Sequence, residues 1–295
     1  MNYASTYAST YDNENYHGSG FASKDEFVHV NSAGYYEFDP PNGLTYRQFG
    51  RQDYYLSYNH SGEMLVKINQ KTHEIGPGTV FIYPPFAEQY YQQKDNQLIS
   101  NYWVHFTGFG IPELLLRSNL EYNQIYNLDV NTEIPGLIEE IIEEISRKQH
   151  DYQHVASTIL QKLFFMISRK NQAKNNNNPN AVRDNRISNS IEFIHKNYRQ
   201  AITVAELSEI SCLSLSRYTA VFREIVGVSP QQYLVRYRLQ KAKELLSTTD
   251  LSVGQIADLV GYPDQFHFSK IFKKHESATP LAYRKNGKAQ RLYTP

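Results

Sequence analysis

Residues 256–274 read IADLVGYPDQFHFSKIFKK, and this stretch decides the fold of the C-terminal part of the chain. Ser252 stands ahead of it as a capping residue for a short helix, and Gly261 allows the chain to reverse direction. Asp264 can cap a second helix that ends near Phe272. A short helix, a turn and a second helix form the helix-turn-helix pattern, whose second helix lies in the DNA major groove.

The same pattern occurs twice in the sequence. Residues 204–208 (VAELS) recur 49 residues later as residues 253–257 (VGQIA). Three further elements recur after 50 residues: Phe222-Arg223 as Phe272-Lys273, Ser229-Pro230 as Thr279-Pro280, and Tyr233 as Tyr283. Two copies of one supersecondary unit, about 204–226 and 253–276, form one domain. A long helix from about 230 to 247 joins them, so the two second helices can enter successive major grooves about 34 Å apart.

These residues resemble the signature of AraC-type transcription regulators over roughly 187–288. The resemblance rests on 256–264, 268–274, Thr279-Pro280 and Tyr283-Arg284 in the second copy, and on 229–234 and 238–242 at the junction with the long helix. The sequence departs from the family at Ser208 in place of Ala, Phe266 in place of a small polar residue, His267 in place of Tyr and Ser277 in place of Gly. A left-handed turn is expected at residue 277, and serine is energetically less favourable than glycine in that conformation.

By this resemblance, the exposed faces of the two second helices supply the residues that contact base edges. They are Ser216, Arg217, Thr219 and Ala220 in the first copy, and Gln265, His267 and Lys270 in the second. Arg and Lys pair with guanine acceptors, Gln pairs with adenine, and Ser or Thr bonds either way. Arg223, Lys273 and Lys274 are predicted to contact phosphates, which positions a protein without specifying sequence. Leu207, Phe222, Ile256 and Phe272 are predicted to be core residues.

The charge distribution agrees with a double-stranded DNA partner. The 30 basic and 30 acidic residues cancel over the whole chain of 295 residues. Residues 181–295, however, contain 17 basic and 10 acidic residues, a balance of +7, and the first 180 residues carry −7. Such asymmetry indicates two differently employed domains. The single cysteine, Cys212, fits a reducing cytosol, and no signal peptide or membrane-spanning run is present, so we expect a cytoplasmic protein.

The strand pattern in the first half of the chain predicts an antiparallel β-barrel or jelly roll over residues 23–130. Segments rich in β-branched and aromatic residues, such as 54–58, 63–68, 79–83 and 99–106, lie between turn sequences. Residues 1–22 are polar and are predicted to be a flexible arm. A helical pair, 131–170, either covers the barrel or forms a dimer seam. An asparagine-rich linker, 171–186, precedes the DNA-binding domain at 187–288.

The resemblance extends over 46–116 to the cupin-like effector domain of the sugar-responsive members of the family. It is carried by 51–56, Gly76-Pro77-Gly78-Thr79, Tyr83-Pro84-Pro85 and 103–108. A barrel mouth lined with aromatic side chains is a usual place for a small ligand. The resemblance places Tyr91, Asn101 and Trp103 at ligand-binding positions, and Asn101 and Trp103 share strand parity. Ser61 stands where the family has a sugar-binding arginine. This departure argues either for a different ligand or for Arg51 or Arg47 supplying that contact.

The sequence therefore predicts a DNA-binding transcription regulator that is controlled by a small effector, a saccharide by the resemblance. We expect the protein to form a homodimer and to contact RNA polymerase. We do not expect it to bind a membrane. No cofactor or metal is expected, because His60, His73 and His105 are isolated. Two alternatives remain open. A cupin-type enzyme fused to a DNA-binding domain would need an acid/base pair, for which the nearby candidates are Glu63, Glu74 and Glu88. A ligand-independent DNA-binding protein would rely on backbone contacts and DNA deformation.

Overall fold

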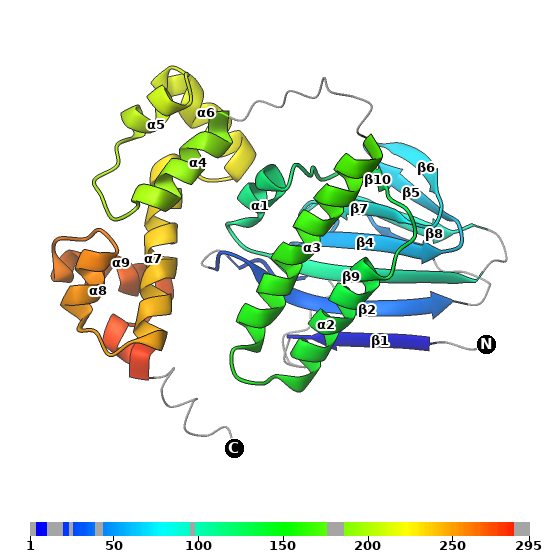
Figure 1. Cartoon of the computed structure of the whole chain (residues 1–295), viewed down its shortest axis with the longest axis horizontal. Helices are drawn as coiled ribbons and strands as arrows, with labels where there is room; N and C mark the ends of the chain where they lie inside the picture. Colours follow the sequence, from blue (N-terminus) through cyan, green and yellow to red (C-terminus); the bar gives the residue numbers. More distant parts are fainter. Residues whose placement is uncertain are drawn as a thin grey trace. The chain divides into compact units, whose positions relative to one another are not determined.

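The computed structural model describes residues 4–10, 20–23, 26–38, 44–94, 98–175 and 186–285 (Figure 1). The chain divides into two compact units, of which the first comprises residues 1–23 and 28–181 and the second residues 24–27 and 182–295. Within the described ranges, all strands lie in the first unit, and the second is helical. The predicted two-domain fold class is confirmed. No described helix is long and apolar enough to cross a membrane.

The first unit contains a six-stranded antiparallel sheet. Its strands lie in the order β1 (Ala4–Ser9), β2 (His29–Phe38), β9 (Ile99–Thr107), β4 (Tyr54–Ser61), β7 (Thr79–Tyr83) and β10 (Ile125–Asn127). Nearly all residues of β4, β7 and β9 are buried, whichever way their side chains point. Both faces of this sheet are therefore covered, one by helices and the other by a second sheet.

The second sheet has four strands in the order β3 (Leu44–Arg47), β8 (Gln89–Gln93), β5 (Met64–Ile68) and β6 (Lys71–Ile75). Burial alternates along β5 and β8, as expected for strands with one covered face. The two sheets share one cluster of buried side chains, which we call the barrel interior. It comprises Tyr55, Met64, Val66, Ile68, Ile75, Phe81, Tyr83, Tyr91 and Ile99, with Tyr36, Trp103 and Ile125 packed against it.

The helices α1 (Ile111–Arg117), α2 (Glu133–Arg147) and α3 (Tyr152–Asn175) belong to the first unit, and α2 and α3 run across the outer face of the large sheet (Figure 1). The isoleucines of α2 are buried with Phe164 of α3 against Val104 and Phe106 of β9. The helical pair is expected from the sequence either to cover the barrel or to form a dimer seam, and the structure shows that its apolar side chains cover the large sheet. Residues 171–175, predicted as linker, continue α3, and residues 176–185 lie outside the described ranges.

The prediction of a flexible arm is wrong for residues 4–9. They form β1, which pairs with β2 from Ala4 opposite Glu37 to Ser9 opposite Ser32. Without β1, strand β2 would be an edge strand with a row of unpaired backbone groups. The composition argument weighed only side-chain burial and missed this backbone pairing, to which Ala8 adds a buried side chain. Residues 11–19 of the predicted arm lie outside the described ranges.

The described part of the second unit contains six helices with defined bounds, and residues 280–285 are helical as well. The six helices are α4 (Arg186–Asn197), α5 (Val204–Ile210), α6 (Leu215–Val226), α7 (Pro230–Thr248), α8 (Val253–Leu259) and α9 (Gln265–Glu276). Thr203, Ser229 and Ser252 form capping boxes, in which the cap side chain and the third helical residue bond to each other's backbone. Gly227 ends α6 at φ 80°, and Ser277 ends α9 at φ 54°. The left-handed turn expected at Ser277 is therefore confirmed.

The long helix α7 holds the two helix-turn-helix motifs on one element. Tyr233, near its start, is buried and contacts the ring of Phe222 on α6, with the two centroids 5.8 Å apart. Leu239, Ala242 and Leu246, nearer its end, share a core cluster with α8 and α9. Two cations of α7 serve this packing: Arg238 donates to the carbonyls of 198 and 200, both at 2.7 Å, and Lys243 pairs with Glu276 at 3.1 Å.

Candidate DNA interface and ligand site

The helices α6 and α9 present corresponding residues on their exposed faces. A shift of 50 residues superimposes the two sequences, so that Ser216 corresponds to Phe266 and Arg217 to His267. Ser214 caps α6 by accepting a bond from the Arg217 amide, and Asp264 caps α9 through the Phe266 amide. Each helix therefore starts at an ordered turn, which fixes the direction of its first residues.

The inner faces of these helices are core and the outer faces are not. Tyr218, Phe222 and Val226 of α6, and Phe268 and Phe272 of α9, are buried. Leu207 and Ile256, predicted as core, are buried as well. The residues predicted to contact bases lie on the other side: Ser216, Arg217, Ala220, Gln265, His267 and Lys270 are exposed, and Thr219 is half-buried and donates to the carbonyl of 215 at 2.9 Å.

The cationic side chains on these outer faces are available for phosphates or bases. Arg223, Lys273 and Lys274, predicted as phosphate contacts, are exposed, as are Arg217 and Lys270. None of these five side chains forms an ion pair with another residue in the described part of the chain. Their charge is therefore not neutralised within the protein, which is the condition for releasing counterions when a duplex binds.

Phe266 is the departure from the family pattern with the clearest structural consequence. Its side chain is 84% exposed, the highest exposure among the large apolar side chains described. It lies at the start of α9, beside Gln265 and His267, where Ser216 lies on α6. An exposed phenylalanine on this face is suited to apolar contact with a thymine methyl group, a feature of the major groove.

In the first unit, the predicted ligand residues meet at the edge of the barrel interior. Asn101 and Trp103 both point to the inner face of β9, in agreement with their parity. Ser57 donates to Asn101 Oδ1 at 2.7 Å, and Trp103 packs against the interior cluster. Tyr91, from the opposite sheet, stacks on Tyr55 with centroids 5.5 Å apart. Burial raises the pKa of the Tyr55 phenol well above its ordinary value, so it stays protonated.

Arg51 is placed differently from the other three residues. Its guanidinium donates to both oxygens of Asp53, at 2.8 and 3.1 Å, and the two side chains are 4% and 0% exposed. Asn31 also donates to Asp53, at 2.8 Å. Burial alone would raise the pKa of Asp53, but contacts with His105 and Arg51 lower it well below the ordinary value. Arg51 therefore serves a buried ion pair rather than a ligand.

His105 contributes less to this network than its position suggests. Its Nδ1 lies 3.3 Å from Asp53 Oδ1 without hydrogen-bond geometry. Burial lowers the pKa of His105 below its ordinary value, so the ring is neutral at pH 7. The charged partner of Asp53 at neutral pH is accordingly Arg51. The imidazole instead packs between Tyr55 and Trp103, with centroids 4.8 and 5.3 Å away.

Arg47, the alternative source of a guanidinium, lies beside Tyr91. Its Nη1 donates to the Tyr91 hydroxyl and to Gln89 Oε1, both at 3.1 Å. Asn101 Nδ2 and Gln89 Nε2 are buried and have no hydrogen-bond partner in the described part of the chain. An unpaired buried amide costs about 1–3 kcal/mol, so such donors indicate a missing partner. Sequence reasoning missed Gln89, although its parity with Tyr91 on β8 was a usable signal.

The residues named for an enzyme lie away from the barrel interior. Glu63 and Glu74 pair with Lys94, and Glu88 pairs with Lys67 at 2.9 Å. His60, His73 and His105 come from different parts of the unit. Within the described ranges, no group of three or more His, Cys, Asp or Glu side chains could hold a metal ion.

Comparisons with known proteins match both units. A family model described as an AraC-like ligand binding domain matches residues 34–164, and one described as a helix-turn-helix domain matches residues 207–286. The raffinose operon transcriptional regulatory protein RafR of Pediococcus pentosaceus is 28% identical over 239 residues, covering 80% of this chain and 86% of that protein. The arabinose operon regulatory protein of Escherichia coli (strain K12) is 24% identical over 260 residues, covering 81% and 82%. The regulator AlkR of Acinetobacter baylyi is 37% identical over 98 residues, covering 33% and 32%.

Proposed function

The chain belongs to the AraC-type family of DNA-binding transcription regulators, and from this premise we propose that a saccharide bound in the barrel interior controls its action on a promoter. One observation carries the proposal: two buried amide donors, Asn101 Nδ2 and Gln89 Nε2, lack partners in the described structure, and their strands, β9 and β8, also supply the aromatic residues Trp103 and Tyr91 to the barrel interior. A saccharide offers hydroxyl oxygens to such donors and an apolar C–H face to the rings.

The proposed ligand site comprises Arg47, Gln89, Tyr91, Asn101 and Trp103. Arg47 replaces Arg51, whose guanidinium is occupied by Asp53. Arg47 and Trp103 remain partly exposed, so a ligand has access to them from solvent. The names of two relatives, regulators of a raffinose and an arabinose operon, favour the same class of ligand.

Trp103 provides a direct measurement, because it is the single tryptophan of the chain. We expect a neutral saccharide, found by titrating a panel against the full chain, to change the Trp103 fluorescence and the affinity for operator DNA. In the Arg47→Gln variant, the saccharide should bind at least tenfold more weakly, because a charged hydrogen bond contributes about 1.5–3 kcal/mol.

The matched control is Arg117→Gln, which removes a half-exposed guanidinium paired with Glu113 on α1. It should leave saccharide binding unchanged, and neither variant should change DNA affinity without saccharide. If no saccharide of the panel alters either the fluorescence or the DNA affinity, the saccharide assignment fails while the DNA-binding function stands.

The base readers are proposed to be Ser216, Arg217, Thr219 and Ala220 on α6, and Gln265, His267 and Lys270 on α9. Arg223, Lys273 and Lys274 are proposed to contact phosphates. The exposed, unpaired cations described above support this division, since phosphate contacts need charge and base contacts need a defined helix face. The two different sets of side chains favour sequence-specific binding over an architectural role.

We add Phe266 to these readers and predict that it senses a thymine methyl group. Replacing one thymine of the selected operator by deoxyuridine should weaken wild-type binding about fourfold, because a buried methyl contributes about 0.8 kcal/mol. The Phe266→Ala variant should bind both operators equally. Fluorescence anisotropy with operators substituted one thymine at a time checks this, and an unchanged thymine preference in the variant would contradict it.

We further propose that the protein forms a homodimer, contacts RNA polymerase and acts in the cytoplasm. Because the isoleucine stripe of α2 is buried within its own unit, a dimer would have to use other surfaces, and Val155 and Phe165 on α3 are exposed apolar residues available for it. Sedimentation of the full chain with and without saccharide measures the oligomeric state.

A further inference from the structure

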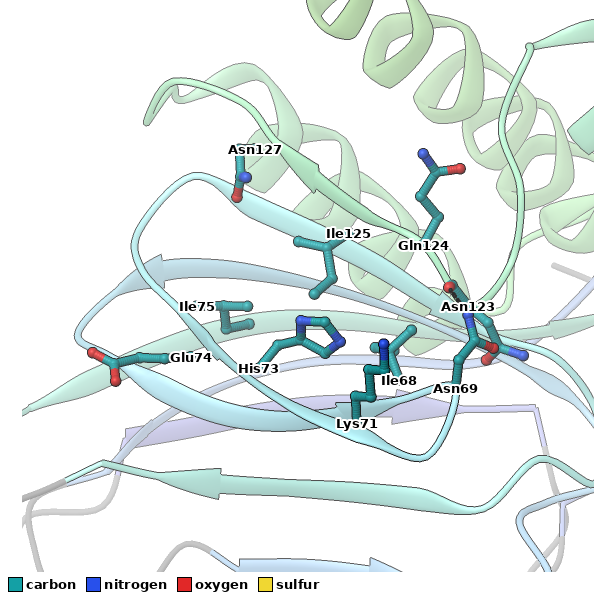
Figure 2. A pocket seen from close by; sticks show the side chains of 10 residues that line it. All are labelled: Ile68, Asn69, Lys71, His73, Glu74, Ile75, Asn123, Gln124, Ile125 and Asn127. Atoms are coloured by element: carbon teal, nitrogen blue, oxygen red, sulfur yellow. Dashed lines mark hydrogen bonds between the residues drawn. The ribbon is translucent and has the colours of Figure 1, made fainter.

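A cavity lies apart from Arg47, Tyr91 and Trp103, where the outer edges of the two sheets face each other. Strand β6 is the last strand of the small sheet and β10 is the last strand of the large one. The cavity between them has a volume of about 680 Å³. Asn69, in the turn between β5 and β6, donates to the carbonyl of Asn123 at 3.2 Å and so joins the two edges (Figure 2).

The walls of this cavity combine an apolar floor with polar groups. Ile68, Ile75 and Ile125 form the floor, and Asn69, Asn123, Gln124 and Asn127 contribute amide groups. Lys71 and His73 share the inward face of β6 with Ile75, because alternate residues of a strand point to the same side. In Figure 2 the side chains of Lys71 and His73 lie next to each other with Ile68 beside them, whereas Glu74 points away from them.

The cationic group of this cavity, the Lys71 ammonium, has no counterion among the described residues. Neither Lys71 nor His73 forms a hydrogen bond or an ion pair with any other residue that the structure describes. The neighbouring carboxylate, Glu74, is bound by Lys94 on the outer side of the hairpin. A cavity of this volume lies within the usual range for small-molecule sites, and its charge favours an anion.

We propose that this cavity binds a phosphorylated saccharide. The Lys71 ammonium contacts the phosphate, since lysine binds phosphate as a point charge, and His73 donates a further hydrogen bond. The amide groups of Asn69 and Asn127 meet the hydroxyls, and the C–H face of the sugar packs on the isoleucine floor. This site is separate from the saccharide site proposed above, because none of its ligand-contacting residues belongs to that site.

Lys71 lies on the edge strand β6 and could also have a purely structural role there, the protection of the strand edge. Inward-pointing lysines on edge strands prevent pairing with other chains. That role requires only one charge on the edge. The cavity is instead lined by Lys71, His73 and four amide side chains around an apolar floor, together with Glu74, whose carboxylate is paired with Lys94. The two roles predict different outcomes on substitution: loss of edge protection gives aggregation, and loss of a ligand contact gives weaker binding by a soluble protein.

The floor of the cavity is also the wall of the barrel interior. Ile68 and Ile75 belong to the interior cluster that contains Tyr55, Tyr83 and Tyr91, and Ile125 packs against it. A ligand on this floor can therefore change the affinity for the interior saccharide, and the interior ligand would change the affinity of this site by the same factor. Through such coupling a regulator would compare a free sugar with its phosphorylated form.

Calorimetric titration of the full chain with glucose 6-phosphate, gluconate, inorganic phosphate and glucose tests the proposal. We expect glucose 6-phosphate to bind, inorganic phosphate to bind more weakly, and glucose not to bind at this site. If gluconate binds more tightly than glucose 6-phosphate, the preferred anion is a carboxylate and the phosphate assignment is overturned. The Lys71→Gln variant should bind glucose 6-phosphate at least tenfold more weakly, and the His73→Asn variant several-fold more weakly.

The matched control is Lys67→Gln on the same hairpin. Lys67 pairs with Glu88, and its variant makes the same change of charge outside the cavity. Equal losses in Lys67→Gln and Lys71→Gln, or no loss in Lys71→Gln, would overturn the proposal. If Lys71→Gln aggregates, Lys71→Arg and His73→Asn carry the test: the first should keep binding and the second should weaken it. Asn101→Ala separates the sites, because it should affect neutral saccharide alone.

Discussion

The Asp53→Asn variant is expected to lose about 3–5 kcal/mol of the free energy of unfolding of the first unit. Removing one partner of a buried ion pair leaves the other charge uncompensated, and here the remaining charge is the Arg51 guanidinium, which is 4% exposed. The variant also weakens the bond from Asn31, which ties β2 to this pair. Urea unfolding followed by Trp103 fluorescence measures the effect, because this tryptophan reports on the first unit alone.

The matched control is Asp129→Asn, whose carboxylate pairs with Lys174 at the surface and is 89% exposed. A surface pair contributes little, so the midpoint should hardly move. Similar small losses in both variants would show that the Arg51–Asp53 pair does not hold the unit together.

The Arg51–Asp53 pair also determines how the free energy of unfolding of the first unit changes with pH. The folded-state pKa of Asp53 lies below its unfolded value of about 3.9, so the unfolded chain binds the proton first as the pH falls. The stability that Asp53 contributes is therefore complete above about pH 5 and is lost as the pH falls through the unfolded-state and then the folded-state pKa. The difference in stability between wild type and Asp53→Asn should be constant from about pH 5 to pH 7 and shrink in more acidic solution.

The Lys270→Ala variant is expected to lose about 1–3 kcal/mol of discrimination at one base position of the operator. Lys270 is exposed on α9 within the proposed base-reading face, without an internal counterion. The Lys274→Ala variant should instead weaken binding to all sequences alike and reduce the salt dependence by about one phosphate contact. Selection of binding sites from a random library, repeated for both variants, separates the two roles.

An unchanged site profile for Lys270→Ala would remove that residue from the base readers. A changed profile for Lys274→Ala would move Lys274 into them. Titration at several salt concentrations provides the control, because only the loss of a phosphate contact lowers the slope of affinity against salt.

The helix-turn-helix motifs were predictable because their signals are local. Thr203, Ser214, Ser252 and Asp264 are caps that act on residues two or three positions away, and Gly261 acts on its own backbone. Such signals depend on short segments of sequence, and the bounds of the elements follow from them. The choice between core and exposed face then follows from helical spacing.

The ligand site was less predictable because it depends on pairing between distant strands. Arg47 and Arg51 are four residues apart, yet Arg47 lies on β3 beside Tyr91 of β8, and Arg51 enters a network with Asn31 of β2 and Asp53. No local pattern distinguishes these two guanidinium groups. The cavity between β6 and β10 was unpredictable for the same reason. These strands belong to different sheets, and only the strand order of the two sheets brings their edges together.

The two reading helices are copies in structure but not in chemistry. Ser216 and Ala220 on α6 correspond to Phe266 and Lys270 on α9, so the proposed base readers offer different groups to the two halves of a DNA site. A DNA site that fits both helices has no internal symmetry and therefore has a direction. Turning such an operator around relative to a promoter exchanges which helix lies nearer the start of transcription, so operator polarity itself becomes a regulatory variable.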